Sequence, residues 1–168
     1  RKELDHSTEQ LRTLPEEAWR TFREFISHTT ILALLFRDGS TTGAVVASDG
    51  LTSDGQGKYR VNTDKIDQLA KHSVMASCGY ASPSMVAAGI LRAYFRIFRL
   101  DRKMEMSVKG RVRQVASLVA HYFSWEDYYF LPLFVAYDHE LHRARIFNVW
   151  MGGGYDERED YYANGSGG

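Results

Sequence analysis

Residues 29–49 read TTILALLFRDGSTTGAVVASD, and this stretch sets the expected fold class. Residues 29–36 are β-branched at the start and apolar afterwards, which predicts a strand that is buried on both faces. The glycine-containing segment at 37–43 predicts a turn, and AVVAS at 44–48 predicts a second strand. The two strands therefore indicate an antiparallel hairpin with a rather long loop.

The rest of the chain predicts further strands on either side of two helices. The strands are YRVN (59–62), VMASCG (74–79), FLPLFVAYD (130–138), RARIFNVW (143–150) and the polar, edge-like YDEREDYYA (155–163). The helices are PSMVAAGILRAYFRIFRL (83–100) and SVKGRVRQVASLVAHYF (107–123), both apolar enough to cover a sheet. Because strands and helices do not alternate singly, the order favours an α+β class with two antiparallel sheets over a parallel doubly wound sheet.

Composition limits the classes of function. The 168 residues make about one domain, and the 44% hydrophobic and 25% charged fractions are typical of soluble globular proteins. The 21 basic and 21 acidic residues balance, so nothing indicates a nucleic acid or a membrane as partner. No apolar run approaches the roughly 20 residues that span a bilayer. The single cysteine, Cys78, indicates a reducing compartment and, on its apolar strand, a core position.

Residues 1–28 differ from the remainder of the chain. Pro15 suits the first turn of a helix, and Trp19, Phe22 and Phe25 follow at helical spacing. This short amphipathic helix fits either an N-terminal arm that packs on a neighbour or a removable pro-segment. The chain lacks an initiator Met and stops directly after a Gly-Ser-Gly turn, so we expect a piece of a longer protein.

Several apparent motifs fail. GQGK at 55–58 lacks the leading glycine of a phosphate-binding loop and the hydroxyl residue that should follow it. The turn at 165–167 resembles a nucleophile elbow, but the glycine needed two residues before the serine is absent. His139 and His142 lie in a predicted hairpin turn without a third ligand nearby. We therefore expect no metal site.

Five residues remain that all occupy predicted strand ends or turns: Thr29, Asp49, Lys65, Gly79 and Ser166. A lone Lys–Asp pair is usually a surface ion pair, and a lone Gly-Ser-Gly is usually only a turn. It is their order and spacing that make them a candidate site.

The spacing resembles that of the β subunits of the proteasome core particle, closest to the actinobacterial type. The resemblance covers roughly residues 29–168. It rests on TTI (29–31), VVASD (45–49), Lys65, Gly79, PLFVAYD (132–138), RIF (145–147), the glycine turn at 152–153 and YANGSG (162–167). It implies a four-layer αββα sandwich of two antiparallel sheets, the fold of the N-terminal-nucleophile (Ntn) hydrolases. Residues 1–28 would be the pro-segment or arm, and 29–168 the domain, with its C-terminal part missing.

The resemblance also implies the chemistry of a threonine endopeptidase. Thr29 would be the nucleophile once residues 1–28 are removed, and its α-amine, with an ordinary pKa of about 7.7 to 8.0, would serve as base. Lys65 would add positive potential beside the hydroxyl, and Asp49 would hold Lys65 charged and oriented. Ser166 would hydrogen-bond near the amine and relay protons.

Substrate binding and partners follow from the same resemblance. The N–H of Gly79 would bind the oxyanion, and Ser53 would pair its backbone with an extended substrate. No cofactor is expected. The expected partners are other β subunits and α subunits in seven-membered rings, an ATP-driven unfoldase and unfolded polypeptide substrates, all in the cytoplasm.

Some features depart from the family pattern. His28 stands where the family has glycine before the threonine, and Gly50 and Leu51 replace basic residues. The first hairpin is four residues longer than usual, and we place the extra residues in its loop at 40–43. These departures keep two alternatives open. One is a catalytically silent structural β-like ring subunit, and the other is a two-ring bacterial peptidase of the HslV type.

Overall fold

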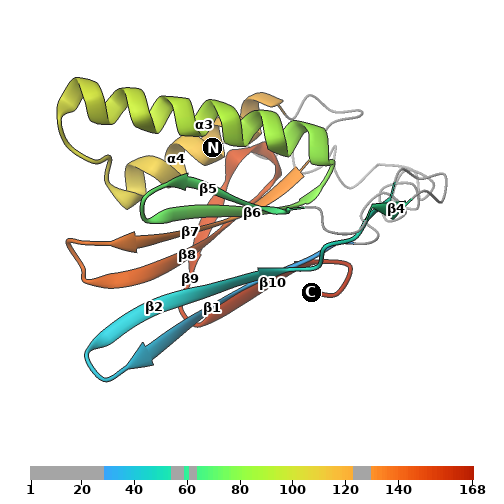
Figure 1. The fold of residues 1–168 in the computed structure, drawn as a ribbon, viewed down its shortest axis with the longest axis horizontal. Helices are drawn as coiled ribbons and strands as arrows, with labels where there is room; N and C mark the ends of the chain where they lie inside the picture. The colour runs from blue at the N-terminus through green and yellow to red at the C-terminus, as the bar shows by residue number, and fades with distance from the viewer. Residues whose placement is uncertain (1–28, 54–58, 61–63, 123–129) are drawn as a thin grey trace, which may run out of the picture.

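The computed structural model describes residues 29–53, 59–60, 64–122 and 130–168. Within them, two antiparallel sheets stack on each other, and a pair of helices covers the outer face of the larger sheet (Figure 1). The predicted α+β class with two antiparallel sheets is confirmed. Of the layers expected for the sandwich, the described residues supply both sheets and the helical layer on one side.

The strands fall into three sheets. The three-stranded sheet has the order β10-β1-β2, the five-stranded sheet has the order β5-β6-β7-β8-β9, and β3 pairs with β4. Their bounds are β1 (Thr30–Asp38), β2 (Thr41–Ser48), β3 (Thr52–Ser53), β4 (Tyr59–Arg60), β5 (Ile66–Ala70), β6 (Ser73–Gly79), β7 (Phe130–Asp138), β8 (Arg143–Val149), β9 (Tyr155–Arg158) and β10 (Tyr161–Gly165). A 3-10 turn, η1 (Met151–Gly153), joins β8 to β9.

Both predicted helices are confirmed. In α3 (Ala81–Arg102), Pro83 lies in the first turn, where a missing N–H costs nothing, and the helix ends at Lys103 with φ 52°. Ahead of α4 (Val108–Tyr122), the Ser107 hydroxyl accepts a backbone hydrogen bond from the first turn at 3.2 Å and so caps the helix. No helix of the described residues combines the length and apolarity needed to cross a membrane.

Two buried clusters hold the layers together. One lies between the helices and the five-stranded sheet and includes Leu91, Phe95, Val112, Phe134 and Phe147. The other lies between the sheets and consists of Ile31, Ala33, Ala76, Cys78, Leu133, Val135 and Ile146. The second cluster fixes the start of β1 against the end of β6, and the predicted core position of Cys78 is confirmed.

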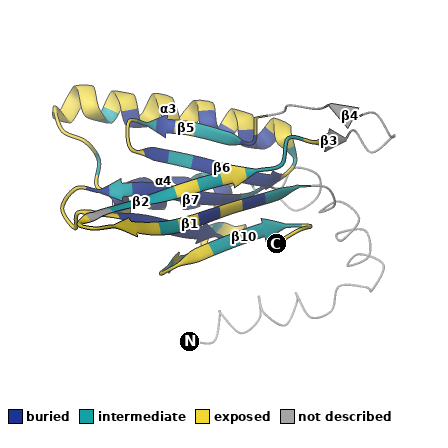
Figure 2. Ribbon diagram, turned by 60° about the horizontal axis from the view of Figure 1, so that its bottom comes forward, coloured by how far each residue is buried: buried dark blue, intermediate teal, exposed yellow. Residues whose placement is uncertain are grey.

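The prediction that the first strand is buried on both faces is wrong for the described residues. Ile31 and Ala33 are fully buried, whereas Leu32, Leu34 and Phe36 are 38–46% exposed (Figure 2). No described element covers that outer face of the three-stranded sheet. The continuous apolar sequence does not reveal the alternation of buried and exposed positions, because apolar residues occupy both faces of β1.

The predicted long loop of the first hairpin is also wrong. Only residues 39–40 form the turn, and Phe36 pairs with Gly43 across the ladder. Gly39 has φ +59°, as two-residue hairpin loops usually require. A Cβ on Gly43 would lie 2.4 Å from the Phe36 ring, so glycine there lets the ring lie across the strand. Most of the extra residues placed at 40–43 therefore lengthen the strands.

Two further elements differ from the sequence prediction. Residues 66–70 form β5, which was not predicted, so Lys65 stands directly before a strand. The single edge strand predicted at 155–163 is two strands, because β9 closes the five-stranded sheet and β10 pairs with β1 in the other sheet. The step between the sheets occurs at residues 159–160, where the polar sequence carries no glycine or proline to signal a turn.

Candidate active site

Lys65 is the centre of the polar cluster. Its carbonyl accepts a hydrogen bond from the Ser77 N–H at 3.1 Å, which ties the residue to β6. The side chain is only 8% exposed. Its ammonium nitrogen, Nζ, lies 2.9 and 2.8 Å from the carboxylate oxygens of Asp49, 3.2 Å from Thr29 Oγ1 and 2.5 Å from the Leu51 carbonyl oxygen. These acceptors take up the three N–H donors of the ammonium and fix its position.

Asp49 follows the last residue of β2 and anchors this lysine. Its Oδ1 accepts the Thr30 N–H at 2.7 Å, and its Oδ2 accepts the Leu51 N–H at 3.0 Å. Partial burial acts to raise the pKa of Asp49, but the hydrogen bonds from Lys65, Thr30 and Leu51 and the lysine charge outweigh it. The pKa of Asp49 is therefore held below its ordinary value of 3.8, and the carboxylate is ionised at neutral pH.

Thr29 and Thr30 are held by hydrogen bonds from the segments that follow β10 and β2. The Thr29 carbonyl accepts the Ser166 N–H at 2.8 Å and the Ser166 hydroxyl at 3.4 Å. On the other side, the Asp49 N–H donates to the Thr30 carbonyl at 3.1 Å. The Thr29 hydroxyl is thereby aimed at Lys65. The structure thus brings four of the predicted residues together: Thr29, Asp49, Lys65 and Ser166.

The turn that carries Ser166 depends on glycine. Gly165 has φ +94°, and a Cβ there would lie 1.9 Å from the Thr29 carbonyl oxygen. A Cβ on Gly167 would lie 2.4 Å from Thr30 Oγ1. Gly165 therefore lets the turn approach the Thr29 backbone, and Gly167 lets it approach the Thr30 side chain.

For the two predicted substrate-binding residues, Gly79 and Ser53, the structure gives positions in strands but no hydrogen bond to Thr29 within the described part of the chain. Gly79 ends β6 opposite Phe130 and has φ 103°, a conformation that favours glycine. Among the described residues, no hydrogen bond joins Gly79 to Thr29. Ser53 lies in β3 opposite Tyr59 of β4. The roles of Gly79 and Ser53 stay predictions.

The arrangement can activate a hydroxyl. An ammonium 3.2 Å from a hydroxyl oxygen stabilises that oxygen as it loses its proton. In the described part of the chain, no imidazole or carboxylate hydrogen-bonds the Thr29 hydroxyl. The described residues also include no group of three or more His, Cys, Asp or Glu side chains placed to hold a metal ion.

Sequence reasoning missed the backbone groups of the site. The Leu51 carbonyl and N–H and the Thr30 N–H complete the shell around Lys65 and Asp49. Backbone groups leave no residue-type signal, so spacing alone could not identify them. The sequence indicates only that Gly165 lies in a turn. It does not show that Gly165 and Gly167 both lie close to the first strand.

Comparisons with known proteins identify the family of the chain. A family model described as "Proteasome subunit" matches residues 27–168. Three relatives are named "Proteasome subunit beta" or "Proteasome subunit beta 2". The one from Acidimicrobium ferrooxidans is 27% identical over 96% of this chain and 59% of its own length. The one from Streptosporangium roseum is 28% identical over 74% and 45%. The one from Pyrococcus furiosus is 29% identical over 86% and 66%. The chain thus spans about half to two thirds of these relatives.

Proposed function

The chain belongs to the proteasome subunit family, and on that premise we propose that it is a threonine-type endopeptidase subunit of a barrel-shaped core particle. One observation carries the proposal. The Lys65 ammonium lies 3.2 Å from the Thr29 hydroxyl oxygen while the Asp49 carboxylate binds the same ammonium. A threonine that serves only as a strand former needs no such partner.

The nucleophile requires activation by cleavage. Thr29 follows 28 residues in the chain, so its nitrogen is an amide and cannot accept a proton. Cleavage between His28 and Thr29 would release an α-amine with an ordinary pKa of about 7.7 to 8.0. A useful fraction of that amine is neutral near pH 7 and lies on the same residue as the hydroxyl. In this proposal, residues 1–28 are a pro-segment, and 29–168 belong to the catalytic domain.

The freed threonine performs acyl transfer. Its hydroxyl oxygen attacks a peptide carbonyl while the hydroxyl proton passes to the amine, and the amine then protonates the leaving peptide nitrogen. Water hydrolyses the resulting ester and restores the threonine. Lys65 stabilises the oxygen as it becomes negative, and Asp49 keeps Lys65 in place.

The remaining residues position the reactants. Ser166 holds the Thr29 carbonyl through its N–H at 2.8 Å, and its hydroxyl lies 3.4 Å from the same carbonyl oxygen. In this proposal the Ser166 hydroxyl relays protons near the new amine. Gly79 offers an N–H for the oxyanion, and Ser53 offers backbone groups to an extended polypeptide. We assign these roles by resemblance to the family.

The proposed setting is a self-compartmentalised protease in the cytoplasm. The subunit would assemble with other β subunits and with α subunits in heptameric rings, and an ATP-driven unfoldase would supply unfolded polypeptide. The subunit itself needs no cofactor in this scheme.

His28 favours a second candidate, a silent β-like subunit that only builds the ring. A side chain directly before the nucleophile restricts the backbone at the bond that must break, where the family has glycine. If that bond stays intact, the Lys65 cluster surrounds a threonine that never gains its amine.

Peptide hydrolysis by the assembled full-length protein separates the candidates. Thr29→Ala should abolish hydrolysis, whereas the matched control Thr30→Ala, one residue further, should retain most of it. Hydrolysis that survives Thr29→Ala would assign the nucleophile elsewhere. An assembled wild-type particle without hydrolysis would favour the silent subunit.

A further inference from the structure

Two histidines from different turns meet at one end of the five-stranded sheet. His72 lies in the turn between β5 and β6, and His139 lies in the turn between β7 and β8. The centres of their rings are 4.6 Å apart, and the ring planes are inclined at 74°. In the sequence, His139 pairs most simply with His142, whereas the structure places its ring beside a histidine that lies far earlier in the chain.

Both turns are fixed by hydrogen bonds. The His72 carbonyl accepts the Tyr137 N–H at 3.0 Å, which ties the β5–β6 turn to β7. The Asp138 carboxylate accepts two backbone N–H groups of the turn that carries His139, both at 3.1 Å, and Arg145 holds the same carboxylate at 2.9 Å. The two imidazoles are therefore mounted on rigid supports, and a ligand that contacts both has little ordering cost to overcome.

The separation of the rings suits chelation of one metal ion. An ion bound to a ring nitrogen at about 2.0–2.1 Å lies about 3.2 Å from the centre of that ring. Two rings whose centres are 4.6 Å apart can then reach one ion at an angle of about 90° between the two nitrogens. The terminal side-chain torsion of histidine is broad, so rotation about it turns both nitrogens toward the ion.

The angle and the ligand type select the metal. Adjacent ligands at about 90° are typical of square-planar and tetragonal ions such as Cu²⁺ and Ni²⁺, and imidazole suits both. Mg²⁺ and Ca²⁺ prefer oxygen ligands, so they should not bind two imidazoles.

We propose that His72 and His139 together bind one divalent late transition-metal ion of the Ni²⁺ and Cu²⁺ class, and that this ion cross-links the two turns. The ion takes no part in the peptidase chemistry. β6 begins at Ser73, directly after His72, and ends at Gly79, so the pair lies at the end of β6 away from the proposed oxyanion donor. The inference therefore does not rest on the proposed function.

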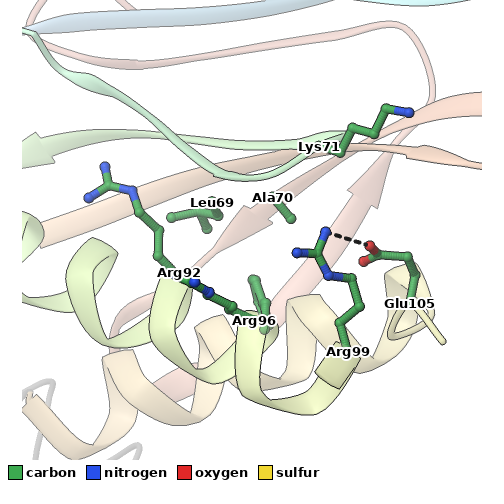
Figure 3. A pocket seen from close by; sticks show the side chains of 8 residues that line it. Leu69, Ala70, Lys71, Arg92, Arg96, Arg99 and Glu105 are labelled. Atoms are coloured by element: carbon green, nitrogen blue, oxygen red, sulfur yellow. Dashed lines mark ion pairs between the residues drawn. The ribbon is translucent and has the colours of Figure 1, made fainter. Parts of the chain in front are cut away.

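Within the described residues, the two imidazoles are the only protein ligands that we assign. The charge of Glu105 acts on His72, but two arginines already hold this carboxylate. Arg111 binds one of its oxygens at 2.7 Å, and Arg99 lies 3.6 Å from the other (Figure 3). Water would complete the coordination, in keeping with the lack of any three-ligand group in the part of the chain that the structure describes.

The charges around the pair make metal binding depend on pH. Loss of hydration lowers the pKa of His72 below its ordinary value of 6.5, and the charges of His139, Lys71 and Arg111 lower it further, whereas Glu105 opposes them. A metal ion binds the neutral imidazole, so His72 is in its binding form at neutral pH. Protons should compete with the metal as the solution becomes acidic.

Titration calorimetry on the tag-free full chain, with Ni²⁺ as the probe, tests the site. The parent chain should bind Ni²⁺ near neutral pH and give no heat with Mg²⁺. His72→Asn and His139→Asn should each weaken Ni²⁺ binding about tenfold or more, because each removes one of the two ligands. His142→Asn is the matched control in the same turn as His139, and it should bind like the parent chain.

Stability gives a second readout. Because the two turns meet only in the folded chain, Ni²⁺ should raise the unfolding midpoint of the parent and of His142→Asn, and EDTA should reverse the rise. The same ion should leave the midpoints of His72→Asn and His139→Asn unchanged. In the parent, binding and stabilisation should weaken together as pH falls from 7 to 5. Circular dichroism follows the melts and confirms that every variant is folded.

Two results would overturn the inference. Unchanged Ni²⁺ affinity in His72→Asn and His139→Asn would place the ion elsewhere on the chain. A parent chain that shows neither heat nor stabilisation with Ni²⁺ would exclude the chelate. Neither result bears on peptide hydrolysis, and a subunit without hydrolysis can still bind the ion. The two proposals can therefore fail independently.

Discussion

Lys65 and Asp49 form an ion pair in which the lysine nitrogen lies 2.8 Å from Asp49 Oδ2, with the lysine 8% and the aspartate 33% exposed. The asymmetry of burial explains the roles of the two residues. The lysine is enclosed and aimed at the Thr29 hydroxyl, whereas the aspartate lies toward solvent and is secured by backbone N–H groups. Asp49 thus holds the positive charge of Lys65 beside the Thr29 hydroxyl.

Removing the lysine should stop catalysis without unfolding the protein. We expect Lys65→Ala to lower kcat/KM for a peptide substrate by about 100-fold or more, because the positive charge beside the developing oxyanion is lost. Lys65→Arg should not restore the rate, because the planar guanidinium is wider than the enclosed ammonium site. Lys71→Ala, at an exposed lysine beyond the other end of β5, is the control and should keep full activity. Near-normal activity of Lys65→Ala would remove Lys65 from the mechanism.

The ion pair should give a defined pH dependence of stability. A carboxyl whose pKa is lower in the folded chain stabilises the fold above its ordinary value of 3.8 and loses this effect as pH falls through the folded value. The unfolding midpoint of wild type should therefore exceed that of Asp49→Asn at neutral pH, and the gap should close below pH 3.8. Thermal melts from pH 2 to 7 measure this, with exposed Asp64→Asn as reference. A gap that widens in acid would contradict the assignment.

Gly165 should tolerate no side chain. Gly152 has φ +80° with open space around it, so Gly152→Ala should cost only the left-handed strain of about 1 to 2 kcal/mol. Gly165→Ala adds a collision with the Thr29 carbonyl and should lose more stability than that, together with activity. Chemical denaturation of the two variants compares them directly. Equal losses would mean that β10 moves freely away from Thr29.

Cys78 should be unreactive in the folded protein. Burial raises the pKa of its thiol to about 11, so almost no thiolate exists at pH 8. Iodoacetamide should leave the folded chain unmodified and label it rapidly once urea unfolds it, as mass spectrometry would record. Rapid labelling of the native protein with loss of activity would instead place a reactive thiol at the site.

Most strands, both helices and the polar cluster were accessible from sequence because they rest on local pattern and on spacing. The helix at 107–123 followed from one apolar stripe, and Thr29, Asp49 and Lys65 followed from the resemblance of their spacing to that of proteasome β subunits. The sequence thus identified side chains that meet in space without showing how they meet.

The missed features depend on contacts between distant parts of the chain. β5 is short and mixed in polarity, so only its pairing with β6 makes it a strand. The first hairpin is long because Thr41 and its neighbours continue the ladder, which residue propensity could not decide. The Leu51 backbone enters the site only after the chain has turned beyond Asp49. Tertiary pairing overrode local preference in each case.

The N-terminus of the assembled protein tests the central claim most directly. Intact-mass measurement on the full-length chain, purified in assembled form, should show loss of residues 1–28 and a mature chain that begins at Thr29. The Thr29→Ala chain should keep the segment, because it lacks the hydroxyl that performs the cleavage. A wild-type chain that begins at any other residue, or that retains His28, would contradict the assignment of Thr29 as the nucleophile.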